Sequence, residues 1–218
     1  MVKLPQKSLE RDALARGHAL VIGIDEVGMG CLAGPVVVCA ASFDSEFFRH
    51  RWKKLERLRD SKLLNADQRE RFAAALKSNP QVQYALSVVY PKEIDEVNIY
   101  QAARLGMRRS IRRLLSGRAD RKHAHLFVDG PHPIAGCDLS QTPVVKGDRK
   151  VFAIAAASIL AKVHRDAMMV RYAKRWPGYA FDVHKGYATA RHRAALGRLG
   201  PSPIHRRSFQ LTFTKNTQ

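Results

Sequence analysis

Short apolar runs that end in acidic residues dominate the hydrophobic pattern of the first half of the chain. Residues 20–24 are apolar and lead directly into Asp25 and Glu26. A run of this length is typical of a buried strand, so we predict a strand that delivers two carboxylates at its C-terminal end. The glycine-rich stretch 28–35 predicts a turn. The apolar run 36–41 predicts the next strand, paired with the first as a hairpin.

The remainder of the chain alternates between helical patterns and strand-like runs. Apolar side chains over 98–115 recur at helical spacing and leave five arginines outside the apolar stripe, which predicts an amphipathic helix. The run 125–129 is mainly apolar until its last residue, Asp129, and predicts a further strand that ends in an acid. The same criteria predict helices over 67–76 and 151–175 and a strand over 82–90.

The order strand, strand, helix, strand, helix, strand, helix indicates an α/β or α+β domain with a mixed β-sheet flanked by helices. The hairpin at its start argues against a Rossmann sheet. Gly28 and Gly30 are not followed by the third glycine of a dinucleotide-binding loop, because Ala33 stands there, and no phosphate-binding GxxxxGK[ST] loop is present. Nucleotide cofactors are therefore disfavoured.

Composition narrows the class of protein. The chain has 218 residues, of which 45% are hydrophobic, which suits one globular domain and excludes a disordered chain. No apolar run approaches the roughly 20 residues of a membrane span, and the start of the chain lacks a signal-peptide core. Three widely spaced cysteines without a CxxC motif favour neither disulfides nor a cysteine-rich zinc site. We therefore expect a cytoplasmic protein, a monomer, with no membrane partner.

The formal net charge of +19 favours a polyanionic partner, chiefly nucleic acid. Over 151–218 there are 12 lysines and arginines but only two acids, Asp166 and Asp182. Where acids are this scarce, each one calls for a reason.

Four of the acids are candidates for a cation-binding site: Asp25, Glu26, Asp129 and Asp166. Strand-end acids at the rim of a core are costly unless they are paired or bind a cation, and carboxylate oxygens suit Mg²⁺. Two metal ions about 3.5–4 Å apart can bridge a scissile phosphate held by basic residues. The alternative, helix caps or salt bridges to the arginines, explains any single acid but explains the set less well.

Several motifs, in order over about 19–209, resemble type 2 ribonucleases H, and bacterial ribonuclease HII in particular. They are 23–30 (GIDEVGMG), 32–37 (LAGPVV), 60–63 (DSKL), 128–130 (VDG), 146–148 (KGD), 154–166 with its Arg-Asp end, 184–187 (HKGY) with Thr189, and 203–209 around His205-Arg206. The resemblance implies a ribonuclease H-like fold over 18–218. It implies that about 176–218 form a C-terminal helical, substrate-binding extension and that 1–17 are an N-terminal segment.

The resemblance also implies an activity. It implies an endoribonuclease that cuts the RNA strand of RNA–DNA hybrids and cuts at ribonucleotides embedded in duplex DNA. The four carboxylates would organise Mg²⁺ or Mn²⁺ in a two-metal site. The remaining alternatives are a nuclease of the same fold class that acts on DNA, and a nucleic-acid-binding module with little catalysis.

Substrate recognition is implied for the loop of Gly28, Met29 and Gly30 and for Tyr187, which would read the 2′-OH at an RNA–DNA junction. The loop departs from the family pattern, because Met29 replaces the usual arginine and Cys31 the usual proline. Backbone amides of a glycine-rich loop can still approach a 2′-OH closely. Because Met29 carries no charge, however, we expect weaker anchoring of a substrate phosphate by this loop. Packing within the C-terminal tail is the alternative role for Tyr187.

Further residues within the motifs are candidates for phosphate contacts. They are Ser61, Lys62 and Lys185, with solvated side chains as the alternative for the lysines. We expect His184 and His205 to be structural hydrogen-bonding groups rather than catalysts. The segment 210–213 (QLTF) faintly resembles a sliding-clamp-binding peptide, so a sliding clamp is a minor candidate partner.

Overall fold

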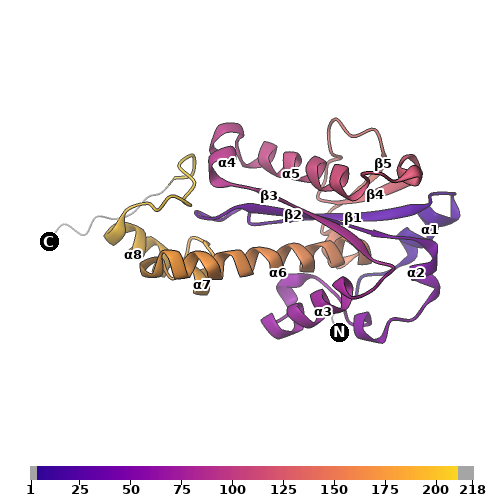
Figure 1. The fold of residues 1–218 in the computed structure, drawn as a ribbon, viewed down its shortest axis with the longest axis horizontal. Helices are drawn as coiled ribbons and strands as arrows, with labels where there is room; N and C mark the ends of the chain where they lie inside the picture. Colours follow the sequence, from indigo (N-terminus) through magenta and orange to yellow (C-terminus); the bar gives the residue numbers. More distant parts are fainter. Residues whose placement is uncertain (1–3, 211–218) are drawn as a thin grey trace.

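A computed structural model describes residues 4–210, and its centre is one five-stranded sheet (Figure 1). The strand order is β3-β2-β1-β4-β5. β1 pairs with β2, and β2 with β3, in antiparallel fashion, whereas β1–β4 and β4–β5 are parallel pairs. The strands are β1 (Leu20–Val27), β2 (Val36–Phe43), β3 (Gln83–Val89), β4 (Ala124–Asp129) and β5 (Ser140–Val144). The mixed sheet predicted from the sequence is confirmed.

Helices cover both faces of this sheet (Figure 1). The α-helices are α1 (Ser8–Ala15), α2 (Ser45–Arg49), α3 (Ala66–Lys77), α4 (Pro91–Val97), α5 (Ile99–Leu114), α6 (Phe152–Arg175), α7 (Phe181–His184) and α8 (Ala190–Leu199). Short 3₁₀ turns are η1 (Lys53–Leu55), η2 (Ser61–Leu63), η3 (Ala119–His123), η4 (Gly147–Arg149) and η5 (Pro177–Tyr179). Among the described residues, no helix is both long and apolar enough to cross a bilayer.

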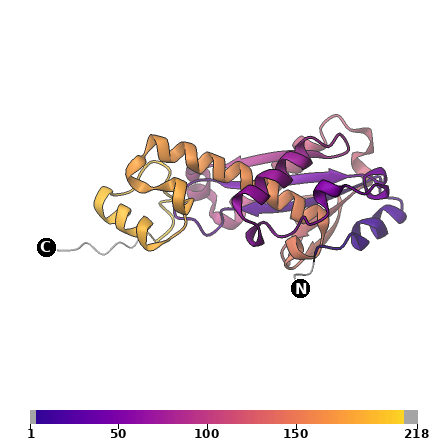
Figure 2. The same cartoon turned by 90° about the horizontal axis from the view of Figure 1, so that it is seen from below.

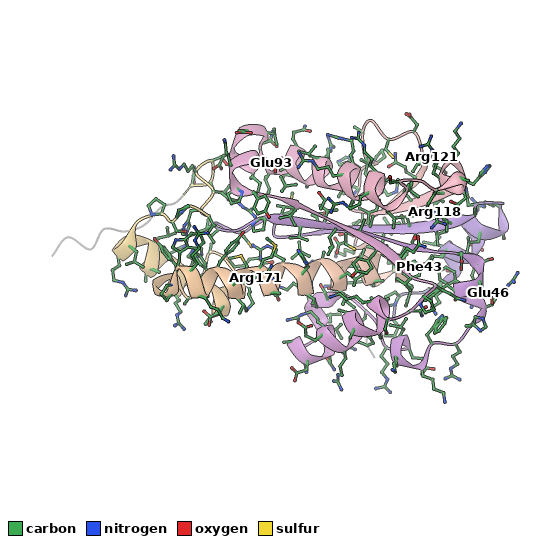
Figure 3. All side chains as sticks on the ribbon, viewed as in Figure 1. Phe43, Glu46, Glu93, Arg118, Arg121 and Arg171 are labelled. Carbon is green, nitrogen blue, oxygen red and sulfur yellow. The ribbon has the colours of Figure 1, made fainter. Side chains whose placement is uncertain are left out.

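The two faces of the sheet form separate hydrophobic clusters. On one face the alanine-rich start of α6 packs on β1 and β2 together with Phe43, which Figure 3 labels. On the other face α5 packs through Met107 and Ile111. The α6 backbone approaches β1 so closely that a Cβ on Gly23 would lie 2.0 Å from the carbonyl carbon of Ala153. This close approach fixes the position of α6 relative to β1.

The C-terminal elements form a third cluster at one end of the molecule (Figure 2). α6 reaches past the sheet, and Met169 on it packs with Phe181 and Leu196 from α7 and α8. Leu32 and Ala33, from the loop after β1, complete this cluster. The loop therefore lies between the sheet and the C-terminal elements.

The N-terminal segment packs against the start of α6. Gln6 donates its backbone N–H to the Lys150 carbonyl at 3.0 Å. Glu10 is fully buried and accepts a hydrogen bond from the Ala153 amide at 2.9 Å. Because α6 has no side-chain cap of its own at Val151, Glu10 satisfies one of the free amides at the N-terminus of this helix.

Candidate active site

Two neighbouring strands bring carboxylates to one end of the sheet. Asp25 and Glu26 lie in β1, and Asp129 is the last residue of β4. The strands run parallel with Ile24 opposite Val128, so Asp25 and Asp129 follow at equivalent positions. Because the strands share a direction, these side chains meet at the same edge.

Burial and neighbouring negative charges raise the pKa of two of these carboxylates, Asp25 and Glu26. Asp25 is only 5% exposed. Burial, followed by the negative charges of Glu26 and Asp129, raises the pKa of Asp25 well above its usual range. Burial, followed by the charge of Asp129, raises the pKa of Glu26 to about 7. The hydroxyl of Ser158 lies near Asp25 and opposes this rise in the pKa of Asp25. A bound cation would favour the charged forms of Asp25 and Glu26 and so lower both pKa values.

A fifth carboxylate, Asp148 in η4, lies beside this cluster. It is buried, and burial together with the charges of Asp60 and Asp129 raises the pKa of Asp148 to about 6. The Nζ of Lys62 lies 3.8 Å from an Asp148 carboxylate oxygen, and its positive charge opposes that rise in pKa. Lys62 is therefore close to the carboxylates as well as exposed.

Asp166 lies on α6 and is already paired with cations. Its Oδ1 accepts a hydrogen bond from Lys162 Nζ at 2.8 Å, and its Oδ2 lies 3.9 Å from an Arg69 nitrogen. The Asp166 side chain is 18% exposed. The structure thus groups Asp25, Glu26 and Asp129 electrostatically and holds the fourth carboxylate through Lys162 and Arg69.

The donor chemistry of the cluster fits a divalent cation. Glu26 Oε2 is buried without a hydrogen-bond partner, in contrast to Asp129 Oδ1, which accepts from the Gly147 amide at 2.7 Å. Within residues 4–210, no group of three acidic, histidine or cysteine side chains is arranged so that it could hold a metal ion. The fit therefore rests on oxygen donors, an unpartnered buried oxygen and mutual repulsion that a cation would relieve.

A buried arginine holds the glycine-rich loop that follows β1. Arg206 is fully buried and donates from Nη2 to the Gly28 carbonyl at 2.6 Å and from Nη1 to the Met29 carbonyl at 2.8 Å. It also donates from Nε and Nη2 to the Gly34 carbonyl at 3.0 and 2.9 Å. With these carbonyls occupied on the inner side, the loop backbone has a fixed conformation.

A second buried arginine, Arg165 on α6, supports the same loop. It donates to the carbonyls of Pro35 at 2.9 Å, Ala33 at 3.2 Å and Lys185 at 2.9 Å. Gly28 has φ +102°, and a Cβ there would lie 2.3 Å from Arg165 Nε, so both conformation and space require glycine.

The loop and Tyr187 lie side by side. Cys31 and Tyr187 form an isolated antiparallel bridge, and burial, with a smaller contribution from the neighbouring Cys31, raises the pKa of Tyr187. The Tyr187 side chain is partly open, with 39% of the residue exposed. Lys162 Nζ lies 5.7 Å from the ring centroid, so the tyrosine adjoins the cation that holds Asp166.

The remaining expected substrate contacts occupy different environments. Ser61 is buried, and its Oγ lies 3.0 Å from Ser158 Oγ, so its hydroxyl supports the Ser158–Asp25 contact from inside. Lys185 has a left-handed backbone (φ +52°), and its ammonium donates to the Asp182 carbonyl. The Met29 side chain is partly buried against the second hydrophobic cluster.

Sequence reasoning missed three residues that shape the site: Asp148, Arg165 and Arg206. All three lie within the motifs that resemble the family, but their burial is visible only in the fold. His184 and His205 are buried hydrogen-bonding groups, as expected.

Comparison with known proteins gives consistent matches. A family model described as Ribonuclease HII matches residues 22–212. Ribonuclease HII of Pelodictyon phaeoclathratiforme is 46% identical over 193 residues, covering 88% of this chain and 90% of that protein. Ribonuclease HII from a complex with PCNA of Archaeoglobus fulgidus is 27% identical with a TM-score of 0.71, covering 88% of this chain and 96% of that one. Bst-RNase HIII in complex with Mn²⁺ shares the fold, at 22% identity and a TM-score of 0.72, over 92% and 70% of the two chains.

Proposed function

Because this chain belongs to the ribonuclease HII family, and is therefore an endoribonuclease with ribonuclease H activity, we propose that its carboxylate cluster is a divalent-metal active site. The substrates would be RNA–DNA hybrids and duplex DNA that contains embedded ribonucleotides. The observation that carries the proposal is the unpartnered, buried Glu26 Oε2, which lies in a cluster where burial and neighbouring negative charges raise the pKa of Asp25 and of Glu26. The basic surface of the protein supports a nucleic-acid substrate.

Asp25, Glu26, Asp129 and Asp166 would hold Mg²⁺ or Mn²⁺ in a two-metal site. Bound metal ions would lower the pKa of an attacking water and offset negative charge on the leaving oxygen. The chain's own contribution is positioning. Ser158, which lies near Asp25, would help to orient this carboxylate.

The positively charged side chains beside the carboxylate cluster would position Asp166 and contact substrate. Lys162 and Arg69 hold Asp166 in place before metal or substrate arrives. Lys62, which is exposed and close to Asp148, could move from that carboxylate to a substrate phosphate. Lys185 would make a weaker phosphate contact, and buried Ser61 would position Ser158 rather than touch substrate.

Recognition of the ribonucleotide would come from the backbone of Gly28, Met29 and Gly30 together with Tyr187. Gly30 is exposed, and a Cβ there would meet no atom within 4 Å, so the loop leaves open space for a sugar. A tyrosine can stack on a sugar or base and hydrogen-bond a 2′-OH, the group that distinguishes RNA from DNA. Met29 supplies no charge, so phosphate anchoring at this position would be weaker than with arginine.

Three further features stay predictions. A monomer in the cytoplasm is one, and the division into a catalytic domain over 18–218 with its extension from about 176 is another. The third is a sliding clamp as partner. The PCNA complex belongs to the Archaeoglobus relative, and most of the 210–213 segment lies outside the described residues.

The test is cleavage of three duplexes, each with Mg²⁺ or with chelator. They are DNA with one ribonucleotide, an all-RNA/DNA hybrid and plain DNA. We expect metal-dependent cutting of the first two only, and its loss in Asp25→Asn with binding retained. Full activity of Asp25→Asn and of Asp129→Asn would contradict the metal site.

A second readout does not depend on activity. Mn²⁺ should raise the unfolding temperature of the wild-type protein, because a ligand that binds only the folded state stabilises it. The rise should shrink in Asp25→Asn. An equal rise in both proteins would place the ion elsewhere.

A further inference from the structure

Three buried histidines lie behind Tyr187. His184, His192 and His205 are 7%, 0% and 3% exposed. The rings of His184 and His192 stack with centroids 4.2 Å apart, and the His192 and His205 centroids are 5.1 Å apart. These three residues belong neither to the carboxylate cluster nor to the glycine-rich loop.

The hydrogen bonds of this group fix the proton position on each ring. The Ser202 backbone N–H, which can only donate, points at His205 Nδ1 from 2.8 Å, so Nδ1 accepts. Neutral His205 then carries its proton on Nε2 and donates to His192 Nε2 at 3.0 Å. His192 must therefore carry its proton on Nδ1, from which it donates to the Tyr187 carbonyl at 2.9 Å. The hydrogen bonds thus form a chain in which each group donates to the next, from the Ser202 amide through His205 and His192 to the Tyr187 carbonyl.

The position of the proton on His184 follows from its hydrogen bonds in the same way. Its Nδ1 accepts from the Gly186 amide at 3.1 Å, and its Nε2 donates to the Tyr179 carbonyl at 2.7 Å. Burial lowers the pKa of His192 and of His205 to about 4, and lowers that of His184. The three rings are consequently uncharged near neutral pH, as this pattern of donors and acceptors requires.

Both backbone groups of Tyr187 are held by this unit. Its N–H donates to the His184 carbonyl at 2.9 Å, and its carbonyl accepts from His192 and from the Thr189 amide at 2.8 Å. The ring is partly exposed and also lies near Lys162 and Arg165, whose cationic groups are 5.7 and 5.9 Å from its centroid. The histidine unit sets the backbone from which this ring projects.

We propose that His192 and His205 are positioning residues that hold Tyr187 against the glycine-rich loop for ribonucleotide recognition. The inference rests on the proposed role of Tyr187 in substrate binding. A positioning role differs from a purely structural role in a way that can be tested. If the histidines position Tyr187, changes to them should affect cleavage only through Tyr187.

The test is a double-mutant cycle on the duplex with one ribonucleotide. His192→Ala should lower kcat/KM about tenfold, the size expected for loss of a buried hydrogen bond that orients a substrate contact. In a Tyr187→Ala background the same change should have almost no further effect. His192→Asn should recover most of the loss, since its amide nitrogen can replace Nδ1 as the donor to the Tyr187 carbonyl.

Leu196→Ala is the matched control. Leu196 is 1% exposed in the same C-terminal cluster but is not part of the hydrogen-bond chain. It should lower the unfolding temperature while leaving kcat/KM nearly unchanged under conditions where the protein is folded. Equal loss of activity in Leu196→Ala, or a His192→Ala effect that persists without Tyr187, would overturn the inference.

The two proposals fail in different ways. If Tyr187→Ala cuts as fast as wild type, the recognition role of Tyr187 is wrong. If Tyr187→Ala is impaired and His192→Ala is not, only the positioning inference is wrong.

Discussion

Replacing Arg206 with methionine tests whether the glycine-rich loop depends on the buried guanidinium of this residue. Methionine has a similar length and suits a buried site, but it cannot donate. The change would leave the carbonyls of Gly28, Met29 and Gly34 without the four hydrogen bonds that Arg206 makes to them. It would also remove the contact of the guanidinium with Phe209, whose ring centroid lies 5.0 Å away.

Two opposing contributions set the magnitude. Hydrogen bonds to a charged group contribute about 1.5–3 kcal/mol each. Burial lowers the pKa of Arg206 to about 10, so the folded state also carries the cost of a desolvated charge, which the variant no longer has. Unpaired buried carbonyls dominate the balance, and we expect a net loss of about 3–5 kcal/mol. For a chain of this size that is roughly a 10 °C fall in unfolding temperature.

The assay is urea unfolding together with cleavage of the one-ribonucleotide duplex. Arg207→Met is the matched control, because the next residue along the chain is also arginine but is exposed. It should change the free energy of unfolding by less than about 0.5 kcal/mol. Arg206→Lys keeps the charge with fewer donors and should lie between wild type and Arg206→Met.

A loss below about 1 kcal/mol in Arg206→Met would refute the reasoning, since it would mean that the loop carbonyls find other partners. Normal cleavage by a fully folded Arg206→Met would separately show that loop conformation does not limit recognition.

Three other predictions concern the loop, the N-terminal segment and the surface. Met29→Arg should tighten binding or speed single-turnover cleavage by up to about one to two orders of magnitude through one added phosphate contact; unchanged rate and salt dependence would show that the position is no anchor. Burial raises the pKa of Glu10 to about 7 from its ordinary 4.5. The protonated form therefore stabilises the fold at low pH, and this stabilisation is lost as pH rises through 7. Glu10→Gln should gain stability over wild type between pH 5 and 8, by up to about 3 kcal/mol in urea unfolding; parallel pH profiles would contradict this. Binding of hybrid duplex, measured by fluorescence anisotropy, should weaken steeply with salt, and a flat response would assign the +19 charge another role.

The central strands were predictable because their apolar runs are buried on both faces of the sheet. β5 was not, because Ser140–Val144 (SQTPV) is a polar edge strand that contains Pro143, and proline is tolerated at an edge where no ladder donor is needed. α1 was also missed, because its apolar positions are few and its buried acid, Glu10, looks like a surface residue in the sequence.

The residues of the candidate site were likewise predictable only in part. Asp25 and Asp129 end predicted strands, so local pattern was enough to bring them together. Arg165 and Arg206 look like ordinary members of a basic surface in a chain with 38 lysines and arginines. Their burial follows from backbone carbonyls that only the folded loop presents, which no local pattern encodes.

The close packing of α6 on β1 limits where this chain can change length. Gly23 touches the helix at Ala153, Ser158 lies beside the carboxylates, and Arg165 meets the loop two turns later. One inserted residue would rotate everything beyond it by about 100° and shift it by about 1.5 Å, so Arg165 would point away from the loop. Insertions and deletions among natural variants should therefore avoid α6 and collect in connections such as 130–139.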